Sequence, residues 1–149
     1  MKTDLKEIYT LGYEGRDADS VFATLKLAGV MTLLDVRLRP QSRKPGLSKS
    51  RLKAKCAEDG IAYVHDRDLG TPSEMMQRVK SGDGYNEGIH EEYRQYLLSR
   101  KTKSLESASK LVVSSPTCLL CFEAEAENCH RRVVAEELAR LTGLTVHHL

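Results

Sequence analysis

The sequence predicts an α/β fold, with an open, mostly parallel sheet of about five strands and flanking helices, in a single domain over residues 1–149. The first observation behind this prediction is the alternation of short apolar runs with amphipathic segments of helical period, which is typical of right-handed βαβ units. The second is the length, which with 40% hydrophobic residues matches one domain that buries its own core. No internal repeat, low-complexity tract or linker indicates a second domain.

The first part of the chain is expected to contain three strands and two helices. The expected strands are residues 8–13, 30–36 and 61–65. The expected helices are residues 18–28, with Asp17 as cap and Gly29 at the end, and residues 49–58, with Ser48 as cap and Gly60 at the end. Residues 37–47 hold two prolines and a glycine, so we expect a loop after the second strand.

The remainder of the chain is less regular at first. Residues 66–85 are polar and contain Pro72, and the pattern leaves open an irregular segment or a short helix over 74–80. Residues 86–115 have a helical composition with a break near 100–103. The last expected elements are a strand over 117–122, a helix over 128–142 that Gly143 ends, and a strand over 144–147.

The basic residues are unevenly distributed. The net charge of +2 is too small to identify a nucleic-acid-binding protein. Residues 36–57, however, contain no acidic residue and these basic ones: Arg37, Arg39, Arg43, Lys44, Lys49, Arg51, Lys53 and Lys55. Because such a segment attracts anions, we expect a small anionic or phosphorylated ligand, with nucleic acid as an alternative partner.

The sequence also favours a compartment and a redox state. No apolar run approaches the about 18 residues of a membrane span, and residues 1–7 are charged where a signal peptide is apolar. We therefore expect a cytoplasmic protein without membrane contact, whose four cysteines are reduced thiols. The oligomeric state is not predicted.

The most specific candidate site follows the fourth expected strand. Ligands of open parallel sheets bind at the carboxyl ends of the strands. Cys121 and Glu123 leave this strand on one side, and Cys129, His130 and Arg131 open the next helix. A helix N-terminus lowers the pKa of a thiol and attracts anions. We therefore expect Cys129 or His130 to be a nucleophile or acid, Glu123 a general base, and Arg131 an anion ligand.

A second group of candidates follows the first two strands. Asp35 and Arg37 end an apolar strand, so we expect them at the ligand edge, with Asp35 as an alternative general base. Together with backbone amides, the side chains of the following loop have the donors to surround a phosphate. The expected anion ligands here are Tyr13, Arg37, Ser42, Arg43 and Lys44.

A metal site and a purely structural network are the competing interpretations. Cys118 and Cys121 have the spacing of half a zinc site, and Cys129 and His130 could complete it. Within one strand, however, Cys118 and Cys121 point to opposite faces, so we expect no metal. No glycine-rich nucleotide signature is present either, and we expect no cofactor. In the structural interpretation Cys129 is a small buried residue and Arg131 pairs with a nearby glutamate.

Taken together, the motifs resemble the DUF488 family, a domain of unknown function widespread in bacteria and archaea. The resemblance rests on residues 10–13 (TLGY), 34–37 (LDVR), 42–46 (SRKPG), 60–65 with 68–70 (GIAYVH, DLG), 120–123 (LCFE) and 129–131 (CHR). It implies this characteristic set: Asp35, Arg37, Ser42, Arg43, Lys44, Cys121, Glu123, Cys129, His130 and Arg131. Cys118 lies outside the set, which argues further against zinc.

The family resemblance implies no specific reaction, so three functional interpretations stay open. The first is an enzyme that acts on a phosphorylated or nucleotide-like substrate at the carboxyl edge of the sheet. The second is a nucleic-acid-binding module that uses residues 37–55. The third is a structural cysteine, glutamate and arginine network without catalysis.

Overall fold

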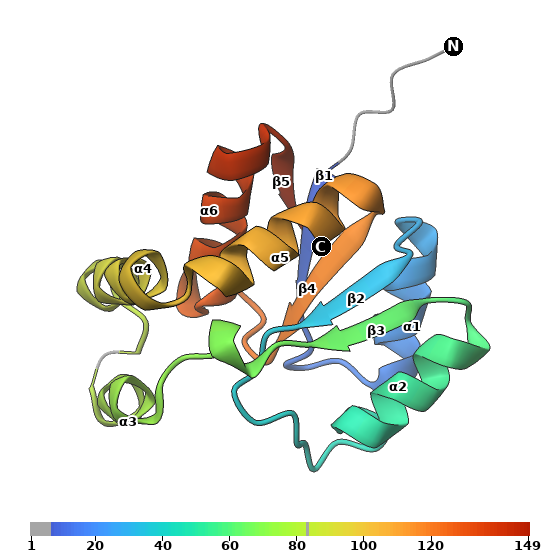
Figure 1. Cartoon of the computed structure of the whole chain (residues 1–149). Helices are drawn as coiled ribbons and strands as arrows, with labels where there is room; N and C mark the ends of the chain where they lie inside the picture. Colours follow the sequence, from blue (N-terminus) through green and yellow to red (C-terminus); the bar gives the residue numbers. More distant parts are fainter. Residues whose placement is uncertain (1–6, 83) are drawn as a thin grey trace.

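Five parallel strands form one open sheet in the computed structural model, which describes residues 7–82 and 84–149 (Figure 1). The strands are β1 (Glu7–Gly12), β2 (Thr32–Asp35), β3 (Ala62–His65), β4 (Thr117–Cys121) and β5 (Thr145–His148). Their order across the sheet is β3-β2-β4-β1-β5, and every pair is parallel. This confirms the predicted α/β class. Most of the charged N-terminal segment lies outside the described residues.

Helices cover both faces of the sheet (Figure 1). The pair α1 (Ala18–Leu27) and α2 (Lys49–Glu58) packs on one face. The other face is covered by α4 (Glu87–Arg100), α5 (Thr102–Ser114) and α6 (Arg131–Thr142). The remaining helix, α3 (Ser73–Ser81), lies beyond the ends of the strands, after the short 3-10 turn η1 (Arg67–Leu69).

Each strand contributes side chains to two separate cores, because successive residues of a strand point to opposite faces. In β2, Leu33 packs against α1 and α2, whereas Leu34 packs against α5 and α6. In β4, Cys118 belongs to the first core and Cys121 to the second. The expectation that these two cysteines face opposite ways is therefore confirmed. All four cysteines are buried free thiols.

Most element boundaries agree with the sequence prediction within two residues. The side chain of Asp17 caps α1 by accepting a hydrogen bond from the amide of Ser20 at 2.8 Å, whereas Ser48 precedes α2 without a side-chain cap. The open question over residues 66–85 is answered by η1 followed by α3. Asp83 of this segment lies outside the described residues.

One boundary differs in a way that matters for the site. The helix expected from Asn128 begins at Arg131, because the 3-10 turn η2 (Ala126–Asn128) precedes it. Two backbone hydrogen bonds form this turn, and they run from the amides of Asn128 and Cys129 to the carbonyls three residues earlier. Cys129 then has an extended backbone, with φ −146° and ψ 145°. It therefore lies in the connection before α6 and not on the helix.

The topology places a crevice between the carboxyl ends of β2 and β4. The chain leaves β2 through α2 toward β3 at one edge of the sheet, and it leaves β4 through α6 toward β5 at the other edge. Where neighbouring connections diverge in this way, an open parallel sheet forms its ligand-binding crevice. Across the described residues, no helix combines the length and the apolar character that a membrane span requires.

Candidate functional site

A pocket of about 770 Å³ opens at this crevice, and we call it the edge pocket. Its walls come from the ends of β1, β2 and β4, from the loop after β2, and from one side of α3. Six residues singled out by the sequence line it, namely Tyr13, Arg37, Ser42, Cys121, Glu123 and His130. The pocket therefore lies at the edge of the sheet where the sequence analysis expects these residues. The other candidates lie outside the pocket lining, for reasons that their contacts explain.

Asp35 and Arg37 are engaged with each other. The Arg37 guanidinium donates two hydrogen bonds to Asp35, from Nε to Oδ1 at 2.8 Å and from Nη2 to Oδ2 at 2.7 Å. The Tyr63 hydroxyl donates to the same Oδ2, and burial together with this bond raises the pKa of Tyr63. Because Asp35 is fully buried and both of its oxygens have donors, it is not available as the general base that the sequence suggested.

Arg37 also connects the loops around the edge pocket. Its Nη1 donates to the Leu47 carbonyl at 2.8 Å and to the Tyr13 hydroxyl at 3.3 Å. Although burial acts against the charged form, the hydrogen bonds and the charge of Asp35 hold the pKa of Arg37 above its ordinary value. Arg37 thus lines the pocket as half of a neutralised ion pair, which positions Tyr13 beside it.

Arg131 does not point into the edge pocket, contrary to the anion-binding role expected for it. Its side chain is completely buried, and Nε donates to Thr10 Oγ1 at 3.1 Å. Its two terminal nitrogens donate to the carbonyl oxygens of Glu123 and Ala124. A Cβ atom on Gly12 would lie 1.6 Å from the Glu123 oxygen and 2.8 Å from Arg131 Nη1. The missing side chain at Gly12 therefore lets Arg131 turn inward and hold the loop after β4.

The basic loop supplies fewer ligands than expected. Lys44 Nζ donates to the carbonyls of Tyr13 and Arg16 at 3.0 and 2.8 Å, so it ties two loops together. Arg43 is exposed and lies outside the pocket lining. Ser42 lines the pocket, and its Oγ accepts a hydrogen bond from the Lys44 amide at 3.1 Å. Of these three residues, only Ser42 reaches the edge pocket.

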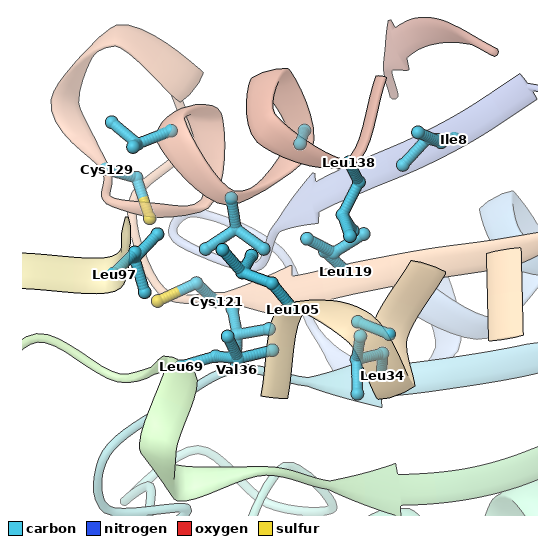
Figure 2. Close-up of a cluster of buried hydrophobic side chains, with 14 of the residues drawn as sticks. Ile8, Leu34, Val36, Leu69, Leu97, Leu105, Leu119, Cys121, Cys129 and Leu138 are labelled. Carbon is cyan, nitrogen blue, oxygen red and sulfur yellow. The ribbon is translucent and has the colours of Figure 1, made fainter. Parts of the chain in front are cut away.

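Cys129 is deeply buried, in the same apolar core as Cys121 (Figure 2). Burial, followed by a hydrogen bond with Cys121, raises the pKa of Cys129 well above its ordinary value. The sequence predicted the opposite direction, on the assumption that Cys129 stands at the exposed N-terminus of a helix. The burial of Cys129 ahead of α6 explains the difference, and it disfavours a thiolate nucleophile at this position.

His130 bridges the crevice from the start of α6. Its Nε2 lies 2.9 Å from the carbonyl oxygen of Val36, which can only accept a hydrogen bond, so Nε2 carries a proton. Nδ1 faces two sulfur atoms, at 3.8 Å from Cys121 Sγ and 3.8 Å from Cys129 Sγ. The ring of Tyr93 packs edge-on against the imidazole, with 5.4 Å between the ring centroids. The imidazole is thereby fixed in one orientation at the base of the pocket.

Glu123 is the carboxylate that the edge pocket offers for acid–base chemistry. It is half-buried and lines the pocket, and its Oε1 lies 3.9 Å from Cys121 Sγ. Within residues 7–82 and 84–149, no lysine, arginine or histidine forms an ion pair with it. Its carboxylate therefore lines the pocket without an ion-pair partner among the described residues.

The sequence did not single out the part of the lining that comes from α3 and the segment before it. These residues are Thr71, Ser73, Met76, Gln77 and Lys80. Ser73, Gln77 and Lys80 are spaced so that they lie on one face of a helix. This spacing is the only feature of the sequence that points to them as part of a site. A polar helix face, however, is also typical of simple solvent exposure. Arg39, which lines the pocket from the loop after β2, was counted only as part of the basic segment.

Comparison with known proteins gives one match. A family model described as "Domain of unknown function DUF488" matches residues 17–138. No curated protein and no solved structure matches the chain. The matched range includes β2, β4, α3 and the start of α6, and so it contains the edge-pocket lining apart from Tyr13.

Proposed function

The chain belongs to the DUF488 family, and we propose that it binds a small anionic, phosphate-bearing ligand in the edge pocket. The observation that carries this proposal is the pair of cations at the pocket. Arg39 enters from the loop after β2 and Lys80 from the end of α3. In the described part of the chain, neither side chain has a hydrogen-bond or ion-pair partner, so both charges are available to a ligand.

The charge balance of the lining supports the same ligand class. The charge of Arg37 is offset by Asp35. This leaves Arg39 and Lys80, both without a partner among the described residues, against the single carboxylate of Glu123 in the lining. Hydroxyl groups of Tyr13, Ser42 and Ser73 add neutral donors to the lining. Phosphate groups are typically bound by such a combination of guanidinium, ammonium and hydroxyl donors.

In this proposal Glu123 gives the pocket a capacity for catalysis as well as binding. A carboxylate without an ion-pair partner, next to a bound anion, can accept or donate a proton during a reaction of the ligand. Cys129 has no part as a nucleophile, because its sulfur is buried and outside the lining. The proposal therefore assigns acid–base chemistry to Glu123 and binding to the two cations.

Calorimetric titration with inorganic pyrophosphate, in the presence of EDTA, tests the binding proposal. One charge-assisted hydrogen bond contributes about 1.5–3 kcal/mol, so Arg39→Ala and Lys80→Ala should each weaken binding about 10- to 100-fold. Arg43→Ala is the matched control, since it removes an arginine from the same loop but outside the pocket. Equal losses for Arg39→Ala and Arg43→Ala, or no binding to the unmodified protein, would refute the proposal.

Nucleic acid is a second candidate ligand, favoured by the exposed basic face of α2. Lys49, Arg51 and Lys53 are exposed there. Other members of the basic segment are already engaged, since Lys55 pairs with Asp59 at 3.4 Å and Lys44 holds backbone carbonyls. Binding of a single-stranded oligonucleotide that falls steeply with salt and is lost in a Lys49, Arg51 and Lys53 triple alanine variant would support this alternative.

A further inference from the structure

We propose that Cys121, Cys129 and His130 form a binding site for a zinc ion, with three protein ligands and a fourth position open to the edge pocket. The two sulfur atoms and the imidazole nitrogen all lie within 4.8 Å of one another. Two of the three ligands, Cys121 and His130, also line the edge pocket, which provides an entry path for the ion. The inference goes beyond the proposed function, because it depends on metal binding alone and on no ligand of the pocket.

The distances are close to those of a tetrahedral site. In a tetrahedron, zinc bonds of about 2.3 Å to sulfur and about 2.0–2.1 Å to nitrogen place a sulfur and a nitrogen ligand about 3.6 Å apart, and two sulfur ligands about 3.8 Å apart. The observed separation between His130 Nδ1 and each sulfur is 3.8 Å. Each nitrogen–sulfur pair is therefore within about 0.2 Å of the tetrahedral separation. The two sulfur atoms, which lie within 4.8 Å of each other, would have to approach to about 3.8 Å on binding the ion.

The imidazole is already oriented as a metal ligand. Metal-binding histidines usually donate their second ring nitrogen to a carboxylate or a backbone carbonyl, which fixes the tautomer and the ring orientation. Here Nε2 donates to the Val36 carbonyl at 2.9 Å. In the neutral ring this leaves the lone pair on Nδ1, directed toward the two sulfur atoms.

The donor set selects the class of metal. Two thiolates and one imidazole favour zinc and other soft divalent ions over magnesium and calcium, which prefer oxygen ligands. On binding, each thiol releases its proton to solvent, and the two thiolate charges offset the charge of the ion. No net charge is then added to the surrounding apolar core, which avoids the cost of a buried unpaired ion. Figure 2 shows both cysteines within this core.

Cys118, the cysteine whose orientation disfavours a zinc site in the sequence, has no part in this set. Its side chain lies in the core on the opposite face of β4. Cys121 and Cys129 lie in one core, because the 3-10 turn before α6 returns the chain over the end of β4. The fourth position faces the pocket, where Glu123 Oε1 lies 3.9 Å from Cys121 Sγ. A water there would stand next to the proposed acid–base group.

Titration of the reduced full-length chain with Co²⁺ tests the proposal directly. Tetrahedral Co²⁺ with thiolate ligands shows an intense sulfur-to-metal absorption band, and competition with Zn²⁺ then gives the zinc affinity. We expect one ion per chain, and a loss of at least about 100-fold in affinity for Cys121→Ala and for Cys129→Ala. Cys118→Ala is the matched control, because it removes a buried thiol from the same strand on the other face.

The outcomes separate metal binding from packing and from the pocket ligand. An unchanged affinity in Cys129→Ala, or no thiolate band with the unmodified reduced protein, would overturn the zinc site. If an alanine variant fails to fold by circular dichroism, His130→Asn provides the same comparison without removing a sulfur from the core. The pyrophosphate titration uses EDTA, so failure of one proposal leaves the result of the other unaffected.

Discussion

Replacing Arg131 with lysine distinguishes a structural role from a ligand-binding one. The buried guanidinium donates to the Thr10 hydroxyl on β1 and to the carbonyls of Glu123 and Ala124 after β4. Lysine keeps the charge but has a single nitrogen, which cannot reach both sets of acceptors at once. A hydrogen bond to a charged group contributes about 1.5–3 kcal/mol, so the loss of two should lower the free energy of unfolding by about 3–6 kcal/mol.

Urea unfolding followed by circular dichroism measures this change. We expect a lower midpoint with an unchanged dependence on urea, and a melting temperature lower by about 10 °C for a chain of this size. Arg132→Lys is the matched control at the next position. Its ion pairs reach Glu87 and Glu136 near the surface, and exposed pairs contribute only about 0–1 kcal/mol.

Equal stability of the two lysine variants would refute this reasoning. If Arg131→Lys then lost pyrophosphate binding while Arg132→Lys retained it, Arg131 would be the anion ligand that the sequence suggested. A large loss of stability in Arg131→Lys alone supports the inward orientation that Gly12 permits.

Three further predictions concern residues around the site and on α6. Gly12→Ala places a Cβ 1.6 Å from a backbone oxygen and should destabilise the fold by about 3 kcal/mol or more, whereas Gly88→Ala, whose Cβ would meet only the Asn86 side chain at 3.3 Å, should change the urea midpoint far less. Asp35→Asn leaves the buried Arg37 without its counter-ion and should cost about 3–5 kcal/mol in the same assay. Partial burial acts to raise the pKa of Glu136, but hydrogen bonds from two arginines hold it below 4.5. The stability it contributes is therefore present above pH 4.5 and lost as the pH falls through the lower folded pKa, and Glu136→Gln should reduce this acid dependence of the unfolding free energy.

The fold was predictable because strand and helix periods differ and alternate along the chain. Strand side chains with a period of two must supply both faces of a sheet that is covered by helices on each side. The same rule predicts that Cys118 and Cys121 point to opposite faces, and the two thiols do lie in different cores.

The site was only partly predictable, because closeness to a strand end does not decide which way a side chain turns. Asp35 and Arg37 are two residues apart, so they leave the strand on one side and neutralise each other. Arg131 turns inward because of the space at Gly12, a contact between residues more than a hundred positions apart. Arg39, farther along the loop, lines the pocket without a partner in the described residues.

The predicted placement of Cys129 at the start of the helix was wrong for a local reason. The segment 126–128 has a composition compatible with an α-helix, and nothing in it marks the shorter 3-10 bonds that the chain forms there. This one turn moves the helix start to Arg131 and carries Cys129 into the core. The part of the pocket wall that α3 supplies was not predicted for a long-range reason. Only packing between segments distant in sequence shows that the polar face of α3 meets the crevice.

These contacts divide the edge pocket into a fixed base and an adaptable rim. The base is held by backbone acceptors, with Arg37 on the Leu47 carbonyl and His130 on the Val36 carbonyl. The rim cations Arg39 and Lys80 are exposed, so a ligand must order each long side chain at a cost of about 0.5–1.5 kcal/mol. Anion binding through the rim alone should therefore be modest. A metal ion at the fixed base would add a strong and already oriented contact beside the Glu123 carboxylate, so metal binding at the thiol and imidazole cluster should strengthen anion binding beyond what the rim cations supply.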